Sequence, residues 1–130
     1  MITKNLRYKN FWLAMGFTMI TFVVYQTLTS SPLGTGIRIS DKLLHITGYF
    51  GMMGWFVQIF NDRKQKILLA AGFVGMGIML EFIQGWGGIR QYEVADMLAN
   101  TTGVALAWAL AYTRFSDILL TVESVIHNKN

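Results

Sequence analysis

The chain has 130 residues, of which 53% are hydrophobic and only 14% are charged, and its formal net charge is +4. A soluble domain usually carries about a quarter charged residues. A chain this short also buries too small a share of its surface to hide so much apolar area from water. The composition therefore excludes an ordinary soluble domain and indicates a membrane protein. The positive charge does not indicate a nucleic-acid partner, because its placement follows membrane topology.

Four apolar segments predict an all-α fold, a transmembrane four-helix bundle that forms a single domain over residues 1–130. Each segment is near the roughly 20 residues that cross a hydrocarbon core. The first is too long for the apolar part of a secretory signal, so we expect an uncleaved helix. The chain has no cysteine, which excludes a disulfide framework. The predicted helices cover residues 10–29, 41–60, 67–84 and 93–112.

Two patterns describe the end of the chain. Small residues recur at every fourth position of the fourth predicted helix, which indicates a seam of close helix contact: Ala95, Ala99, Gly103, Ala107 and Ala111. Beyond this helix, apolar residues at helical spacing predict a short C-terminal amphipathic helix on the membrane surface: Phe115, Ile118, Leu119, Val122, Val125 and Ile126.

Most lysine and arginine residues fall on one side of the predicted bundle. Arg38, Lys42 and Arg90 lie on the other side. By the positive-inside rule, the side with more cations is cytoplasmic. We therefore expect both termini in the cytoplasm and the 30–40 and 85–92 loops outside. The cytoplasmic group consists of Lys4, Arg7, Lys9, Arg63, Lys64, Lys66, Arg114 and Lys129.

Polar side chains recur in the outward third of three predicted helices. Asp41 and His45 are four residues apart and so share one helix face, which Tyr49 continues. Ionisable residues inside a membrane are costly, and they are functional candidates by default. We therefore predict that these helices and the loop after the third surround a small hydrated pocket. Its ligand-binding residues would be Asp41, His45, Glu81, Gln84, Arg90, Asp96 and Asn100.

Structural interpretations of single residues remain open beside this one. Asp41 suits the first turn of a helix, where the dipole favours an acid. Lys42 suits an interface lysine whose ammonium group reaches the head groups, and Glu93 suits a first-turn anchor outside the site. Alternatively, Glu81 and Asp96 could join Arg90 in an ion network that only fixes helix register.

The stretches "DKLLHITGYFGMMGW" and "EFIQGWGGIRQYEVADMLANTTG" resemble the VanZ-like family of small bacterial membrane proteins. The family pattern is Asp-Lys-x-x-His, then Glu-x-x-Gln, Arg, Asp-x-x-x-Asn and a glycine. The resemblance implies a multipass protein of the bacterial cytoplasmic membrane. The founding member is associated with low-level resistance to the glycopeptide teicoplanin, and no established catalytic mechanism comes with the family. The matching residues are Asp41, Lys42, His45, Glu81, Gln84, Arg90, Asp96, Asn100 and Gly103.

Three functions compete at this stage. The first is binding of a cell-envelope ligand in the outward pocket, namely a lipid-linked saccharide, a lipid head group or a glycopeptide. The second is a membrane-embedded enzyme acting on a lipid phosphate or another envelope substrate, with His45 as a base beside Glu81 or Asp96, or with these three residues on a divalent metal. The third is a small proton-linked transporter, for which four helices offer little room.

The sequence also sets expectations for partners and cofactors. One histidine with carboxylates is a weak metal signal, and no cofactor motif is present, so we expect no cofactor. The expected partners are membrane lipids and a cell-envelope lipid or glycan, without nucleic acid. The sequence leaves a homo-oligomer open.

Overall fold

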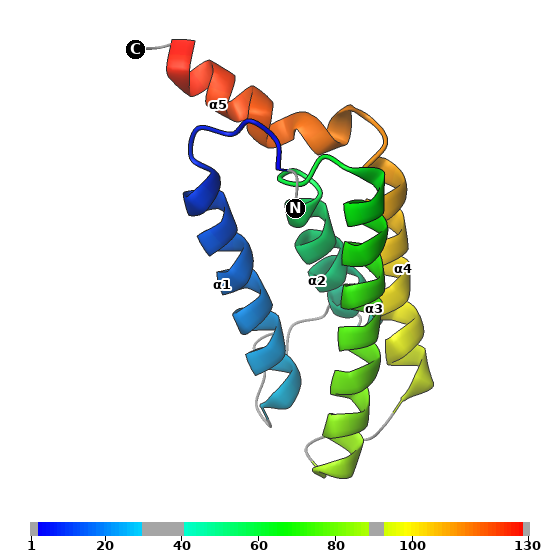
Figure 1. Cartoon of the computed structure of the whole chain (residues 1–130). Coiled ribbons are helices and arrows are strands. Elements are labelled where there is room, and N and C mark those ends of the chain that lie inside the picture. The colour runs from blue at the N-terminus through cyan, green and yellow to red at the C-terminus, as the bar shows by residue number, and fades with distance from the viewer. Residues whose placement is uncertain (1–2, 30–40, 89–92, 129–130) are drawn as a thin grey trace.

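The structure, a computed structural model, describes residues 3–29, 41–88 and 93–128, which form five α-helices and one 3-10 turn. The predicted all-α class is confirmed. Four helices run alongside one another, and the last lies across one end of them, where the start of the chain also lies (Figure 1). The elements are α1 (Lys9–Leu28), α2 (Asp41–Phe56), α3 (Arg63–Trp86), α4 (Val94–Leu110), η1 (Arg114–Asp117) and α5 (Ile118–Asn128).

Two of these helices are long and apolar enough to cross a membrane, and a third candidate is bent. α1 has 20 residues with a mean hydropathy of 1.5, and α3 has 24 residues with a mean hydropathy of 1.9. α4 qualifies only together with the segment Arg114–His127, which turns from it by 81°. α2 has 16 residues, or about 24 Å at the α-helical rise. The described residues thus give two to three candidate spans, where the sequence predicted four.

The second helix ends earlier than predicted, at Phe56 instead of residue 60. The backbone N–H of Lys4 donates a 2.7 Å hydrogen bond to the carbonyl oxygen of Ile59. Thr3 and Phe60 form an isolated antiparallel bridge. The start of the chain therefore occupies backbone groups that a longer helix would have used. The other three predicted helices begin and end within a few residues of α1, α3 and α4.

α2 and α4 approach each other closely at Gly103. A Cβ atom placed there would overlap the backbone carbonyl oxygen of Ile46 and lie 2.9 Å from the backbone nitrogen of Phe50. Such an approach of two backbones is typical of membrane helices with small residues at the contact. The predicted seam is confirmed at four of its five positions, since Ala99, Gly103, Ala107 and Ala111 are buried and Ala95 is exposed.

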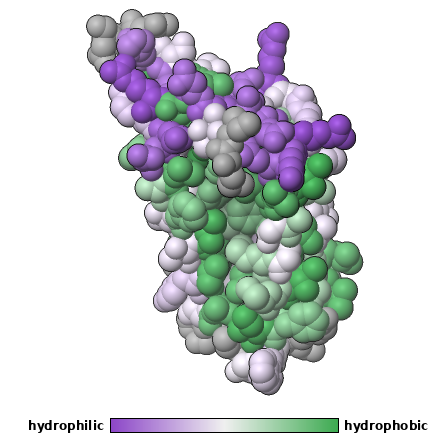
Figure 2. Space-filling model, in the orientation of Figure 1, coloured by the Kyte–Doolittle hydropathy of each residue, from purple (hydrophilic) through white to green (hydrophobic). Residues whose placement is uncertain are grey.

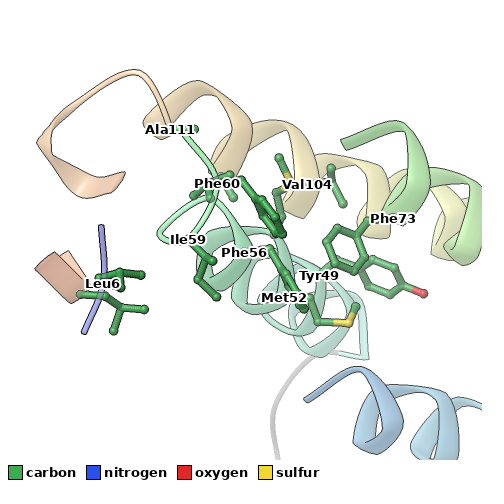
Figure 3. Close-up of a cluster of buried hydrophobic side chains, with 13 residues drawn as sticks. Leu6, Tyr49, Met52, Phe56, Ile59, Phe60, Phe73, Val104 and Ala111 are labelled. Carbon is green, nitrogen blue, oxygen red and sulfur yellow. The ribbon is translucent and has the colours of Figure 1, made fainter. Parts of the chain in front are cut away.

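The apolar core surrounds α2 and the turn after it (Figure 3). Met52 and Met53 are fully enclosed, and Phe56 packs against the ring of Phe73 on α3 with the centroids 5.7 Å apart. In contrast, α1 and α3 present large apolar side chains outward along the hydrophobic zone of the molecule (Figure 2). These exposed side chains include Phe11, Phe17, Phe22, Leu68, Met79 and Phe82.

The hydrophilic end of the molecule in Figure 2 is a layer that we call the cap. It consists of residues 3–8, 57–66 and 111–127. Its buried polar side chains bond mainly to backbone groups of distant segments. Lys4 Nζ donates to the carbonyl oxygen of Ser116, Gln58 Nε2 donates to that of Phe115 at 2.6 Å, and Lys66 Nζ donates to that of Ala111 at 2.9 Å.

Glu123 on α5 is the acceptor that holds the start of α1. Its carboxylate accepts hydrogen bonds from the backbone N–H groups of Arg7 at 2.6 Å and Tyr8 at 2.9 Å, and from the indole of Trp12 at 2.6 Å. Burial alone would raise the pKa of this carboxyl, but the three donors and the charge of Arg7 outweigh it and lower the pKa. Glu123 is therefore held in its ionised form.

Candidate functional site

A group of polar side chains lies at the end of the bundle opposite the cap, where α2 and α4 begin and α3 ends (Figure 1). We call it the polar cluster. Its described members are Lys42, His45, Glu81, Glu93, Asp96 and Asn100.

Lys42 joins the first turns of α2 and α4. Its ammonium group forms an ion pair with Glu93 Oε2 at 2.6 Å and a second, shorter one with Asp96 Oδ1. The side chains of Lys42 and Glu93 are 37% and 47% exposed, whereas that of Asp96 is 9% exposed. Lys42 thus connects an exposed carboxylate at the surface of the cluster with a buried one in its interior.

His45 lies one turn further along α2 and faces two α4 residues. Its Nδ1 is 2.8 Å from Asn100 Oδ1, and its Nε2 is 3.7 Å from Asp96 Oδ1. Because a carbonyl oxygen can only accept, Nδ1 carries the hydrogen in this arrangement. Nε2 then lies on the side of the ring that faces the Asp96 carboxylate.

Glu81 brings α3 into the same cluster. The side chain is 2% exposed, and its Oε1 accepts a 2.8 Å hydrogen bond from the backbone N–H of Glu93, the residue before α4. It is also close enough to Asp96 and His45 to interact with their charges. The structure therefore brings together His45, Glu81, Asp96 and Asn100, which the sequence analysis had placed around one pocket.

The structure does not place the remaining three predicted site residues in the cluster. Gln84 is 1% exposed, and its Nε2 donates a 2.5 Å hydrogen bond to the carbonyl oxygen of Thr27, so it joins α3 to the end of α1. The side chain of Asp41 and the whole of Arg90 lie outside the described part of the chain. Their assignment to the site stays a prediction, as does the binding role of the other residues.

Two members of the cluster were not among the site residues that the sequence predicted. Lys42 was expected either to reach the interface or to balance the carboxylates, and Glu93 to be an anchor outside the site; the structure pairs the two with each other. Helical spacing contained the signal that would have found them. Lys42 precedes His45 by three residues and Glu93 precedes Asp96 by three, which places each on the face of a predicted site residue.

The described cluster offers groups for acid–base and hydrogen-bonding chemistry. It holds three carboxylates together with Lys42 and His45. Within residues 3–29, 41–88 and 93–128, no three His, Asp or Glu residues are placed to hold a metal ion. The arrangement can accept hydrogen bonds at its carboxylates and exchange a proton at His45 Nε2.

Comparison with known proteins adds a coarse assignment. No protein-family model matches the chain, and no solved structure matches it. The chain is similar to NADH-ubiquinone oxidoreductase chain 2 of Polypterus ornatipinnis, with 22% identity over 93 residues. The match covers 71% of this chain and 26% of that protein, about a quarter of its length. Together with the candidate spans, this similarity to a membrane subunit supports a small helical membrane protein.

Proposed function

We propose that the chain is a VanZ-like protein of the bacterial cytoplasmic membrane whose polar cluster faces outward and binds a cell-envelope ligand. The ligand classes are a lipid-linked saccharide, a lipid head group and a glycopeptide. A contribution to teicoplanin resistance follows from the resemblance to the family. The observation that carries the proposal is the convergence of His45, Glu81, Asp96 and Asn100 from three helices at one end of the bundle.

The distribution of charge supports the orientation. The cap contains Lys4, Arg7, Lys64 and Arg114 and is the hydrophilic end of the molecule (Figure 2). Cations of this kind are enriched on the cytoplasmic side of membrane proteins. With the cap in the cytoplasm, the polar cluster lies at the outer side, where envelope lipids and glycans are found.

The proposal includes α2 and α4 as two further, short spans. Their 16 and 17 residues correspond to about 24 Å and 26 Å, a few ångströms less than the roughly 30 Å hydrocarbon core. Local thinning of the bilayer accommodates a mismatch of this size at modest cost. It would also bring the polar cluster close to the outer head groups.

The same geometry supports a second candidate, a membrane-embedded enzyme. His45 Nε2 lies 3.7 Å from the Asp96 carboxylate, and a histidine beside an acid is a common general base. Turnover of a polyprenyl-phosphate substrate by the wild type, lost in His45→Gln, would favour this candidate over simple binding.

Thermal stability in detergent tests the binding proposal. The probes are teicoplanin, a polyprenyl-diphosphate-linked N-acetylglucosamine and polyprenyl phosphate alone. We expect at least one probe to raise the melting temperature of the wild type, and the rise to be lost in His45→Ala and Asp96→Asn. Gln58→Ala is the matched control, because it removes hydrogen bonds of the cap and leaves the cluster intact. An equal rise in all four proteins would contradict the proposal.

A further inference from the structure

Tyr49 is a buried polar residue on the face of α2 that carries His45. It lies one turn beyond His45, and its side chain is 2% exposed. Its hydroxyl group has no hydrogen-bond partner within the described residues. Figure 3 shows this hydroxyl at one edge of the apolar cluster, pointing away from Phe56 and Leu6.

An unpaired buried hydroxyl is unfavourable. Removing it from water without a replacement hydrogen bond costs about 1–3 kcal/mol in proteins. Folded proteins satisfy nearly all such groups with protein atoms or ordered water. Helix segments within a membrane follow the same rule, because hydrocarbon offers no partner. An oxygen or nitrogen atom from outside the described residues would therefore be expected beside Tyr49.

The surroundings of Tyr49 are polar on the side of the cluster. Glu81 is close enough to interact electrostatically with the phenol. Gly77 lets the Tyr49 ring and the Asn100 side chain pack closely against α3, since a Cβ atom there would lie only 3.3 Å from Tyr49 Cε1 and 3.2 Å from Asn100 Nδ2. Tyr49, Gly77 and Asn100 thus meet directly below the bond between Asn100 and His45.

We infer that the hydrated space of the polar cluster continues one helical turn past His45, and that Tyr49 donates its hydroxyl hydrogen there to a neutral oxygen atom. That oxygen belongs to water or to a hydroxyl group of a bound saccharide. The second source rests on the proposed binding function, whereas the first does not.

The charge of the cluster selects a neutral oxygen over an anion. Glu81 is close to this space, and the ammonium group of Lys42 is already paired with two carboxylates. A phosphate placed beside Tyr49 would meet the Glu81 carboxylate, while Lys42 is held by Glu93 and Asp96. A hydroxyl oxygen meets no such repulsion and can donate its own hydrogen to a carboxylate.

Cysteine accessibility tests the inference directly, because the chain contains no cysteine of its own. The variants His45→Cys, Tyr49→Cys and Met53→Cys place one thiol on each of three successive turns of a single helix face. The purified variants are exposed, in lipid nanodiscs that leave both membrane faces accessible, to a small, charged methanethiosulfonate reagent that does not enter hydrocarbon. Only the thiolate reacts, and it forms in water. Met53 is 0% exposed and lies in the apolar core, so it sets the background rate.

We expect His45→Cys and Tyr49→Cys to react faster than Met53→Cys by on the order of tenfold or more, as expected when a thiol reaches water. Labelling of Tyr49→Cys at the background rate, in protein that elutes as folded in size exclusion, overturns the inference. Protection of Tyr49→Cys by the polyprenyl-linked saccharide assigns the oxygen to a ligand. Labelling without protection assigns it to water, and counts against the binding proposal alone.

Tyr49→Phe provides a second measurement, which needs no ligand. The substitution removes the hydroxyl group and changes the shape of the side chain little. If water satisfies the hydroxyl, its removal leaves the melting temperature unchanged or lowers it. If the hydroxyl is truly unpaired, its removal raises the melting temperature, and that result would also overturn the inference. Tyr25→Phe, at a position 64% exposed on α1, is the matched control.

Discussion

The two polar ends of the molecule use their side chains in different ways. In the cap, Lys4, Gln58, Lys66 and Glu123 bond mainly to backbone groups of distant segments. In the polar cluster, the contacts between α2 and α4 join side chain to side chain. Backbone groups cannot leave without unfolding the chain, whereas side chains can exchange partners. The cap is therefore suited to hold the fold, and the cluster is suited to exchange its contacts for those of a ligand.

The largest expected effect comes from the helix contact on which the cluster depends. Gly103→Ala places a methyl group against the backbone of Ile46 and Phe50. Small backbone shifts cannot relieve this overpacking, so we expect the free energy of unfolding to fall by about 3 kcal/mol or more. The free energy of unfolding in mixed micelles measures it. Gly72→Ala is the control, because nothing lies within 4 Å of its added methyl group. Equal stability of the two variants would mean that α2 and α4 do not meet at Gly103.

The next effect tests the cap. Glu123→Ala leaves the N–H groups of Arg7 and Tyr8 and the indole of Trp12 without their acceptor, and we expect a loss of about 3 kcal/mol in the free energy of unfolding. Ser124→Ala, at the adjacent exposed position, should change it little. A small loss in Glu123→Ala would show that the cap does not hold α1.

The role of Glu123 can also be tested through the pH dependence of stability, for which the direction of the change is known. Folding lowers the pKa of Glu123 below its ordinary value of 4.5, so the ionised carboxylate stabilises the fold above that value. The contribution disappears as the pH falls through the lower, folded pKa. Glu123→Gln should flatten this acid limb of the stability curve. If the acid limb is the same in Glu123→Gln as in the wild type, other carboxylates cause the loss of stability at low pH.

The smallest effect concerns the polar cluster itself. A double-mutant cycle of Lys42→Met and Asp96→Asn should give a coupling free energy of only about 0.5–1 kcal/mol, because the lysine is partly exposed and its charge is screened. The corresponding cycle with Glu93→Gln, at the more exposed partner, should give less. A coupling as large as the loss in Glu123→Ala would remove the distinction between the two ends.

Helical periodicity in the sequence predicted the features that are determined within a single segment. It predicted the apolar helices, the small-residue seam of α4 and the helix face shared by His45 and Tyr49. It missed features that depend on distant segments. The segment from Val57 to Phe60 is apolar apart from Gln58, and its backbone pairs with the distant residues Thr3 and Lys4 instead of continuing the helix. In the same way, nothing near Glu123 in the sequence indicates that its partners begin at Arg7.

The contacts of Glu123 also constrain how the protein is made. They join residues 7–12 to residue 123, so they cannot form while the ribosome is still adding α4. During that time α1, which buries only Gly16 within the described structure, has few neighbours to hold it in place. Long-range contacts of this kind form late. Of the described helices α1 is therefore the last to be fixed, and a chain shortened before α5 would leave it free to drift in the bilayer.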